Sequence, residues 1–309
     1  SDVYKRQYYG YDDFRGIQEE CIDSILEGND TICVMATGGG KSVTFQIPGL
    51  MLDGLTLVIS PLISLMNDQV LNLKKIKVCA GTINSNTDEY EESNVIKDIK
   101  AEKLKFLYLS PERLLNPKYE KLLLECNISQ LVLDESHCLS QWGHDFRPSY
   151  FKIIDFIKKI AKKPIISCFT ATADDLVIKD IKEALNINPK IFKSSFDRPM
   201  LYYETIRCKD KKMFIFDFIA KHNDVAGIIY TLTRKNTEHL YQFIKEKGFK
   251  VSMYHGGLED DVKRKNQNEF LEGKTMIMVA TNSFGLGIDH KTCLLYTSPS
   301  PRDVEEARM

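Results

Sequence analysis

The 309-residue sequence lacks the features of several common protein classes. No apolar run reaches the roughly 18 residues of a membrane-spanning helix, and the opening SDVYKRQYYG contains no apolar signal-peptide core. The net charge is only −1, so nucleic-acid binding would require a local basic and aromatic surface rather than a global field. We therefore expect an ordinary globular protein located in the cytoplasm.

Cysteine spacing argues against a zinc ribbon. None of the eight cysteines forms a C-x-x-C pair, the spacing of common structural zinc sites. Scattered thiols are typical of the reduced core of a cytosolic protein. We expect no zinc site in this chain.

Two series of apolar runs predict the fold. Between amphipathic segments lie β-branched runs at 31–36, 55–60, 105–110, 131–135 and 165–171, and a second series at 227–232, 251–255 and 275–281. Near-continuous apolar strands separated by helices indicate a parallel sheet covered on both faces. The sequence therefore predicts an α/β fold of two lobes, with a junction at about 195/196.

A glycine-rich loop follows the first expected strand. MATGGGKS (35–42) also opens a helical pattern, so its backbone N–H groups can point at one anion at the positive end of a helix. Lys41 can then reach the β- and γ-phosphates, and Ser42 can ligate Mg²⁺. The alternative without a binding function is a flexible glycine turn with a solvated lysine. The strand–loop–helix context favours a site for a nucleoside triphosphate.

LVLDESH (131–137) delivers two carboxylates at the end of another buried strand, where open α/β sheets place their ligands. Asp134 suits the Mg²⁺ shell, and Glu135 suits orientation of the attacking water. Alone, an Asp-Glu pair is most often a solvated loop start, and His137 a core or loop histidine. Together with the glycine loop, the pair predicts an NTP hydrolase.

Along residues 8–291 the sequence resembles the RecQ family of DNA helicases, within helicase superfamily two. The segments that carry the resemblance are YYGYDDFRGIQEECI (8–22), TGGGKS (37–42), SPLISLMNDQV (60–70), LSPERLL (109–115), DESHCLSQWGHDFRPSY (134–150), FTATA (169–173), SFDRPM (195–200), IIYTLTRKNTE (228–238), YHGGL (254–258) and VATNSFGLGID (279–289). The general P-loop pattern has a glycine six residues before the lysine, where this chain has Met35. The family also lacks that glycine. The resemblance implies two RecA-like parallel-sheet lobes with flanking helices.

The resemblance also assigns roles to residues. ATP binding would fall to Phe14, Arg15, Gln18, Thr37, Gly38, Gly39, Gly40, Lys41 and Ser42, with Mg²⁺ on Ser42 and Asp134 and catalysis by Lys41, Asp134 and Glu135. Coupling between nucleotide and DNA would use His137, Gln141, Thr170, Thr172 and Asp289. DNA would meet Trp142, His144, Phe146, Arg147, Arg234 and Thr281.

The aromatic loop after the carboxylates supports work on DNA independently. Trp142 is the only tryptophan of the chain, and Phe146 and Arg147 follow closely. Aromatic and guanidinium planes stack on unpaired bases at roughly 1–3 kcal/mol each. For Phe146, a small hydrophobic cluster over the sheet edge is an equal alternative.

The implied function is an ATP-dependent DNA helicase that moves 3′ to 5′ along single-stranded DNA and unwinds duplex or branched DNA in recombination and repair. One alternative is an RNA-remodelling ATPase, because the phosphate loop and carboxylates are shared with RNA helicases. Another is a nucleotide- and DNA-binding module without turnover. The family's lobe-two arginine lies in a Gly-Arg-x-Gly-Arg stretch that this chain does not contain.

Both ends of the chain carry matched foreign-looking segments. SDVYKRQ (1–7) and CLLYT (293–297) can be read from the two strands of one inverted DNA repeat, which resembles a transposase end used in sequencing adaptors. Such segments are excluded from fold reasoning. We therefore expect a first lobe at 8–195, a truncated and incomplete second lobe at 196–292, and non-native, poorly packed residues at 1–7 and 293–309.

Overall fold

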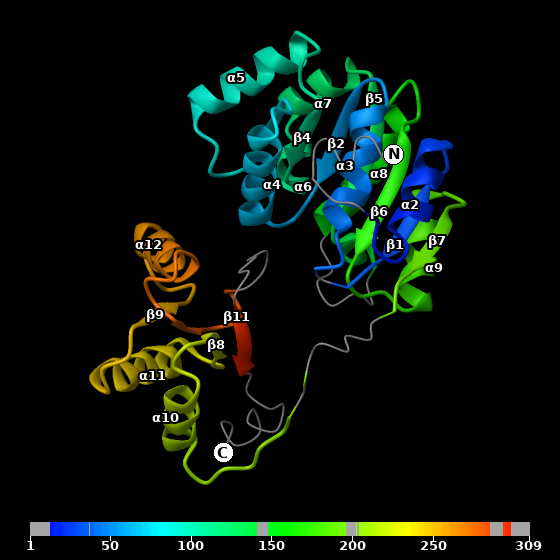
Figure 1. Cartoon of the computed structure of the whole chain (residues 1–309). Helices are drawn as coiled ribbons and strands as arrows, with labels where there is room; N and C mark the ends of the chain where they lie inside the picture. The colour runs from blue at the N-terminus through cyan, green and yellow to red at the C-terminus, as the bar shows by residue number, and fades with distance from the viewer. Residues whose placement is uncertain are drawn as a thin grey trace. The chain divides into compact units, whose positions relative to one another are not determined.

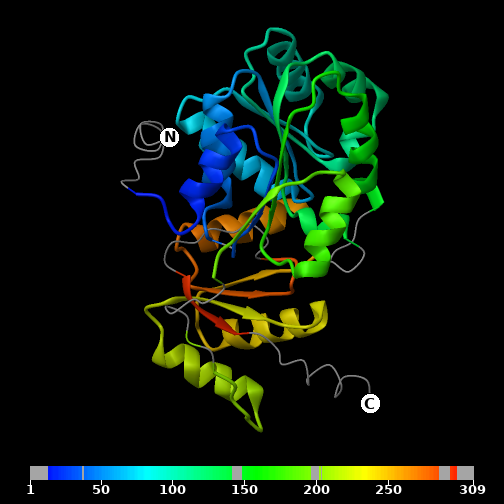
Figure 2. The same cartoon turned by 90° about the vertical axis from the view of Figure 1, so that its right-hand side faces the viewer.

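The computed structural model describes residues 13–36, 38–140, 148–195, 202, 204–284 and 293–297, with only the backbone described at 148 and 293–297. Two compact units divide the chain, Ser1–Met200 and Leu201–Met309. They run from blue to green and from yellow-green to red in Figures 1 and 2. The sequence-based junction at 195/196 stays a prediction.

A seven-stranded parallel sheet forms the centre of the first unit (Figure 1). Its strands are β1 (Thr31–Val34), β2 (Leu55–Ile59), β3 (Ala80–Ile83), β4 (Phe106–Leu109), β5 (Ile128–Leu133), β6 (Ile165–Thr170) and β7 (Lys190–Lys193). The strand order is β3-β4-β2-β5-β6-β1-β7. Every described pairing in it is parallel.

Helices cover both faces of this sheet. They are α2 (Gln18–Leu26), α3 (Lys41–Met51), α4 (Ile63–Lys75), α5 (Glu89–Lys100), α6 (Pro111–Leu114), α7 (Pro117–Leu124), the short 3-10 helix η2 (Ser136–Leu139), α8 (Pro148–Lys159) and α9 (Asp175–Leu185). On one face α2, α3 and α4 join Cys33 and Val58 in a core cluster. On the other face, α5 and α7–α9 pack with Ile32 and Leu57. Neighbouring strand residues thus point to opposite cores, which explains their continuous hydrophobicity.

Short polar side chains fix where several helices begin. Asp88, Asn116 and Asp174 each accept a hydrogen bond from a backbone N–H in the first turn of α5, α7 and α9. Helix N-termini leave such donors without a partner inside the helix, and these caps satisfy one of them. At the other end, α9 is followed by Asn186 in the left-handed conformation, a common helix ending.

The second unit has a smaller parallel sheet with the order β11-β8-β10-β9. Its strands are β8 (Ala226–Tyr230), β9 (Val251–Tyr254), β10 (Ile277–Ala280) and β11 (Cys293–Thr297), and its helices are α10 (Lys211–Lys221), α11 (Arg234–Glu246) and α12 (Asp260–Leu271). Ile219 of α10 and Ile244 of α11 pack on one face, and Phe270 of α12 on the other. The predicted α/β fold of two parallel-sheet lobes is confirmed.

The backbone of β11 corrects one expectation. Cys293 pairs with Ala226 and Thr297 with Ile229, in parallel and with one register shift. The expectation of poor packing from residue 293 is therefore wrong for the five residues of this strand. An exposed strand edge offers unpaired N–H and C=O groups, and the apolar and β-branched CLLYT suits pairing with it. The non-native origin of the segment stays a prediction.

No described helix combines the length and hydrophobicity that crossing a lipid bilayer requires.

Candidate nucleotide-binding site

The candidate site lies where four neighbouring strands of the first sheet end. The carboxyl ends of β2, β5, β6 and β1 carry Ser60, the Asp134–Glu135 pair, Thr170 and the glycine loop, respectively. Because these strands are parallel and adjacent, their carboxyl ends meet at one edge of the sheet. The topology thus assembles four chemically distinct segments that lie far apart in the sequence.

Backbone conformation in the phosphate loop depends on its glycines. Gly38 and Gly40 have φ of 81° and 84°, a region that L side chains rarely adopt. A Cβ at Gly39 would come within 2.9 Å of the carbonyl oxygen of Ala36. Gly40 is the N-cap of α3, and no side chain caps the described helix start. The N–H groups of the first turn therefore remain available to an anion such as a phosphate.

Gln18, the first residue of α2, forms hydrogen bonds both to this loop and to the segment before the helix. Its Nε2 donates to the carbonyl oxygens of Gly39 and Gly40 at 3.2 and 3.3 Å, and its Oε1 accepts from the N–H of Arg15 at 2.9 Å. Gln18 is buried, Phe14 is half-buried and Arg15 is exposed. Of the three residues before the loop that were assigned to ATP binding, Gln18 contacts the phosphate loop directly, and the backbone of Arg15 is bonded to Gln18.

Lys41 forms an ion pair with Glu135. Lys41 Nζ lies 3.4 Å from Glu135 Oε1, although 94 residues separate them. The other carboxylate oxygen of Glu135 lies 3.4 Å from His137 Nδ1. The glutamate thus stands between the phosphate-reaching lysine and the histidine that the sequence assigned to coupling.

His137 continues this chain to β6. Its Nδ1 is 3.0 Å from Thr170 Oγ1, and Thr170 Oγ1 donates to the carbonyl oxygen of Thr172 at 3.0 Å. Because the threonine proton is used there, the hydrogen-bond network assigns a proton to His137 Nδ1, which donates to Thr170. Glu135 Oε2 lies 3.4 Å from the same Nδ1, so this single N–H is shared between Thr170 and Glu135 and connects the loop after β6 to the carboxylate.

Asp134 is a buried carboxylate held from three sides. Its Oδ2 accepts from Ser60 Oγ at 3.3 Å, its Oδ1 accepts from the N–H of Glu135 at 3.0 Å, and its carbonyl oxygen accepts from Tyr150 OH at 2.9 Å. Burial, followed by the charge of Glu135, raises the pKa of Asp134 to about 6, against the opposing effect of Lys41. The carboxylate is fixed in place and costly to keep charged.

Glu135 differs from Asp134 in both backbone and electrostatics. Its φ is 48°, a left-handed conformation that costs about 1–2 kcal/mol for such a residue and is found preferentially at functional sites. Burial alone would raise the pKa of Glu135, but the His137 hydrogen bond and the Lys41 charge outweigh it and hold the pKa below its ordinary value. Two adjacent carboxyl groups with pKa values pushed apart are suited to different roles.

The donors at this edge fit Mg²⁺ bound with a nucleotide. Mg²⁺ prefers hard oxygen ligands and usually takes only one or two from protein, completing its shell with phosphates and waters. The Asp134 carboxylate and the Ser42 hydroxyl are such ligands. No cluster of three or more His, Cys, Asp or Glu that could hold a metal occurs among the described residues. The donor set therefore resembles a shared protein–phosphate magnesium site rather than an all-protein cage.

In the second unit, Arg234 lies over a glycine pair. A Cβ at Gly257 would come within 3.1 Å of Arg234 Cδ and Nη1. His255 Nδ1 accepts from the N–H of Gly257 at 3.2 Å, while its Nε2 lies 3.3 Å from Glu238 Oε1 without hydrogen-bond alignment. Thr281 follows β10 and bonds Ser283 at 2.8 Å. Arg234 and Thr281 thus both lie at carboxyl ends of strands in their own sheet.

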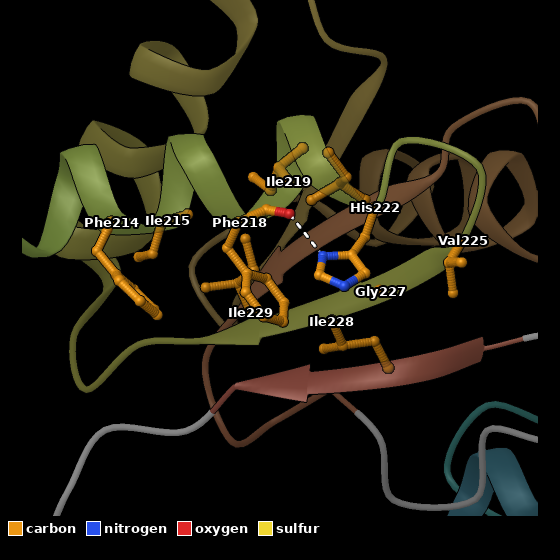
Figure 3. A pocket seen from close by; sticks show the side chains of 10 residues that line it. Phe214, Ile215, Phe218, Ile219, His222, Val225, Gly227, Ile228 and Ile229 are labelled. Carbon is orange, nitrogen blue, oxygen red and sulfur yellow. Dashed lines mark hydrogen bonds between the residues drawn. The ribbon is translucent and has the colours of Figure 1, made fainter. Parts of the chain in front are cut away.

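The close-up in Figure 3 shows an apolar pocket of the second unit, between α10 and β8. Phe214, Phe218 and Ile228 line it, and its one imidazole, His222, bonds the carbonyl oxygen of Phe218 at 2.8 Å. No set of converging polar groups lines this pocket, so it has no chemistry to offer a nucleotide.

Seven predicted site residues lie outside the described part of the chain, and their roles stay predictions: Thr37, Gln141, Trp142, His144, Phe146, Arg147 and Asp289. Sequence reasoning also missed polar partners that the structure reveals, namely Gln46, Gln69, Tyr108 and Tyr150. The only sequence signal for the glutamines was an amide on an otherwise apolar helix face.

A glycine loop after β1 and paired carboxylates after β5 define a P-loop nucleotide-binding lobe. The family model for the DEAD/DEAH box helicase matches residues 15–181, and that for the helicase conserved C-terminal domain matches 210–303. The chain belongs to the DEAD/DEAH box helicase family.

Within that family the chain is RecQ-like. It is 39% identical over 301 residues to the ATP-dependent DNA helicase RecQ of Bacillus subtilis (strain 168), covering 96% of this chain and 51% of that protein. The chain thus spans about half the length of this curated relative.

Solved structures agree on the fold. S. cerevisiae Dbp5 bound to RNA and ADP BeF3 matches with a TM-score of 0.74 at 20% identity, covering 96% of this chain and 79% of that one. The helicase MrfA bound to DNA matches with a TM-score of 0.73 at 18% identity, covering 96% and 46%. Identities this low show the fold alone, which is that of RecA-like helicase lobes.

Proposed function

We propose that this chain is the motor of an ATP-dependent DNA helicase, which couples ATP hydrolysis to movement along single-stranded DNA and to duplex unwinding. The observation that carries the proposal is the Lys41–Glu135–His137–Thr170 chain beside buried Asp134. It combines a phosphate-reaching cation, a water-orienting carboxylate and a link to the next strand end. The RecQ name of the relative supports DNA as the substrate.

Nucleotide binding would rearrange the ion pair. The phosphates of ATP would meet the free N–H groups of the loop and the first turn of α3, and Lys41 would turn to them from Glu135. Glu135 would then be free to orient the attacking water. Ser42 and Asp134 would hold Mg²⁺, which would neutralise charge developing on the phosphates.

Loss of the Lys41 contact would also change the coupling segment. Among the described side chains, Glu135 would keep His137 as a hydrogen-bonding partner, and His137 would pass that change to Thr170 and the loop after β6. We propose this as the route from nucleotide state to DNA grip, with the aromatic loop at 142–147 as the grip. Single-stranded and branched DNA are the proposed partners, and 3′-to-5′ movement is the proposed direction.

Turnover by the 309-residue chain is proposed to be slow. A lobe-two arginine that meets the γ-phosphate is worth several orders of magnitude in related motors, and the sequence contains no Gly-Arg-x-Gly-Arg stretch. Nucleotide binding depends on first-lobe residues and should persist without it.

The test compares ATP hydrolysis by the purified chain without nucleic acid, with single-stranded DNA and with single-stranded RNA of equal length. Measurable DNA stimulation that Lys41→Ala and Glu135→Gln abolish supports the proposal, and strand displacement from 3′- and 5′-overhang duplexes assigns the direction. Greater stimulation by RNA would support an RNA-remodelling ATPase instead. Nucleotide-dependent DNA affinity with no turnover, even in a chain extended by the arginine stretch, would indicate a binding module.

A further inference from the structure

A row of buried and half-buried amide and hydroxyl groups runs from the sheet to the phosphate loop. Gln46 Nε2 donates to Tyr108 OH and to Gln69 Oε1, each at 2.8 Å, and Gln69 Nε2 donates to Ser42 Oγ, also at 2.8 Å. These residues come from β4, α3 and α4. Gln46 and Tyr108 are almost fully buried, at 3% and 1% exposure, and Gln69 is half-buried.

The hydrogen bonds of this row run in one direction. Gln46 Nε2 donates to both Tyr108 OH and Gln69 Oε1, so the oxygen of the Gln69 amide faces Gln46 and its NH₂ group faces Ser42. The orientation of the Gln69 amide is thereby linked to Gln46 and Tyr108, two buried residues of the sheet side.

The consequence for Ser42 is a constrained hydroxyl. A serine hydroxyl has one proton and two lone pairs, and Gln69 occupies one lone pair. One lone pair and one proton remain for the nucleotide side. This is the arrangement that a metal ligand needs if it is also to donate a hydrogen bond to a phosphate or carboxylate oxygen.

Gln69 also connects the site to a second segment. It lies on α4 between Met66 and Val70, whose side chains anchor that helix in the core. Helix α4 begins at Ile63, three residues after Ser60, which itself donates to Asp134. The segment 60–63 therefore lies between two links to the site. At its start Ser60 bonds Asp134, and after its end helix α4 bonds Ser42 through Gln69.

We propose that Gln69 is a positioning residue that orients the Ser42 hydroxyl for Mg²⁺ and transmits the state of that hydroxyl to α4. The proposal rests on the nucleotide site described above and deepens it by adding a metal-responsive link to the segment 60–70. Loss of the Gln69 donor should weaken magnesium-dependent nucleotide binding without affecting binding that needs no metal.

The experiment measures the affinity of the full chain for a fluorescent ADP analogue, once in Mg²⁺ and once in EDTA. The ratio of the two affinities is the magnesium gain. Gln69→Met keeps side-chain volume and removes both hydrogen bonds, while Gln46 retains Tyr108 as a partner. Gln242→Met is the matched control, since Gln242 is a surface amide of α11 that bonds Glu246.

Gln69→Met should reduce the magnesium gain by about threefold to tenfold, the effect of one hydrogen bond. Its affinity in EDTA should stay within about twofold of the wild type, as should both affinities of Gln242→Met. In a Ser42→Ala background, Gln69→Met should have no further effect. Hydrogen exchange should show that Mg²⁺·ADP changes amide protection in 63–70 in the wild type but not in Gln69→Met.

A magnesium gain in Gln69→Met equal to that of the wild type overturns the positioning role alone. If Gln69→Met lowers the ADP affinity in EDTA as much as in Mg²⁺, Gln69 has a general structural role and the positioning role is overturned. The same holds if Gln69→Met has its full effect in the Ser42→Ala background. The wild type tests the underlying site separately. No binding of ADP in either condition overturns the proposed nucleotide site, and binding without a magnesium gain overturns the proposed magnesium ligands together with this inference.

Discussion

Lys41 Nζ lies 3.4 Å from Glu135 Oε1, and both side chains are largely shielded from solvent, at 14% and 19% exposure. The two groups expected to act on the phosphate and on the attacking water thus neutralise each other before any ligand arrives. Partial burial makes such a pair stronger than a surface salt bridge. An incoming phosphate must therefore compete with Glu135 for the lysine.

Lys41→Ala tests that competition. Removing the ammonium eliminates the phosphate contact, so affinity for ATP should fall at least tenfold, because a hydrogen bond to a charged group contributes about 1.5–3 kcal/mol. Isothermal titration with ATP and Mg²⁺ measures it. Lys118→Ala is the control, because Lys118 is an exposed lysine that also pairs with a glutamate, Glu92. A comparable loss in the control would contradict the assignment.

The pH dependence of magnesium binding should follow Asp134. Burial raises its pKa to about 6, so lowering the pH from 8 to 5 should protonate it and weaken Mg²⁺·ADP binding, while binding in EDTA changes less. Titration of fluorescent ADP across this range gives the midpoint. A magnesium-dependent affinity that stays constant between pH 8 and pH 5 would contradict the assignment of Asp134 as a magnesium ligand with a raised pKa.

Lowering the pH should stabilise the fold through Asp134, although it weakens magnesium binding at the same residue. A folded-state pKa above the unfolded value of 3.8 means that the charged carboxylate destabilises the fold at neutral pH. The contribution of Asp134 to the free energy of unfolding should therefore rise as the pH falls through about 6 toward 4. Asp134→Asn should raise the melting temperature at pH 7.5 and remove this pH-dependent part. A destabilised variant at pH 7.5 would contradict the sign.

Tyr150→Phe isolates a contact that supports the carboxylates. The lost hydroxyl leaves the carbonyl oxygen of Asp134 without this donor in a buried place, at a cost of about 1–3 kcal/mol. Chemical denaturation should show that loss, and the magnesium gain in ADP affinity should fall as Asp134 becomes less well held. Tyr90→Phe, at a residue 78% exposed, should change neither quantity.

Gly40→Ala and Gly28→Ala separate backbone strain from crowding. Both glycines have positive φ, 84° and 87°, but a Cβ at Gly40 would overlap the Gln18 amide, whereas nothing lies within 4 Å at Gly28. Gly28→Ala should cost about 1–2 kcal/mol from the left-handed conformation alone. Gly40→Ala should cost more, and Gln18→Ala should restore the excess. Equal losses in the two single variants would show that the overlap relaxes freely.

The sequence predicted the central strands better than the edge strands. β1, β2, β4, β5 and β6 are apolar runs, because helices cover both of their faces. β3 (Ala80–Ile83) and β7 (Lys190–Lys193) were not predicted, and both are edge strands of the sheet. Edge strands carry smaller or charged residues. In β3, Gly81 leaves room for Val95 of α5, since a Cβ there would lie 2.8 Å from that side chain.

The candidate site was predictable in its members but not in its bonds. Spacing and resemblance brought Lys41, Asp134, Glu135, His137 and Thr170 together, because parallel strand ends converge. The amide row through Gln69 was not visible, since it depends on how α3 and α4 pack. The pairing of β11 was not predicted, because CLLYT was excluded from fold reasoning as one strand of the inverted repeat shared with residues 1–7.

The left-handed backbone of Glu135 has a consequence for protein engineering. Asn or Gly at this position would suit the local geometry better than glutamate does, just as Asn at position 134 would remove a buried charge. A screen that rewards heat resistance alone should therefore enrich for changes at these two adjacent positions, which carry the two carboxylates proposed to act in hydrolysis. Libraries built from this chain should hold both positions constant, or select for turnover at every round.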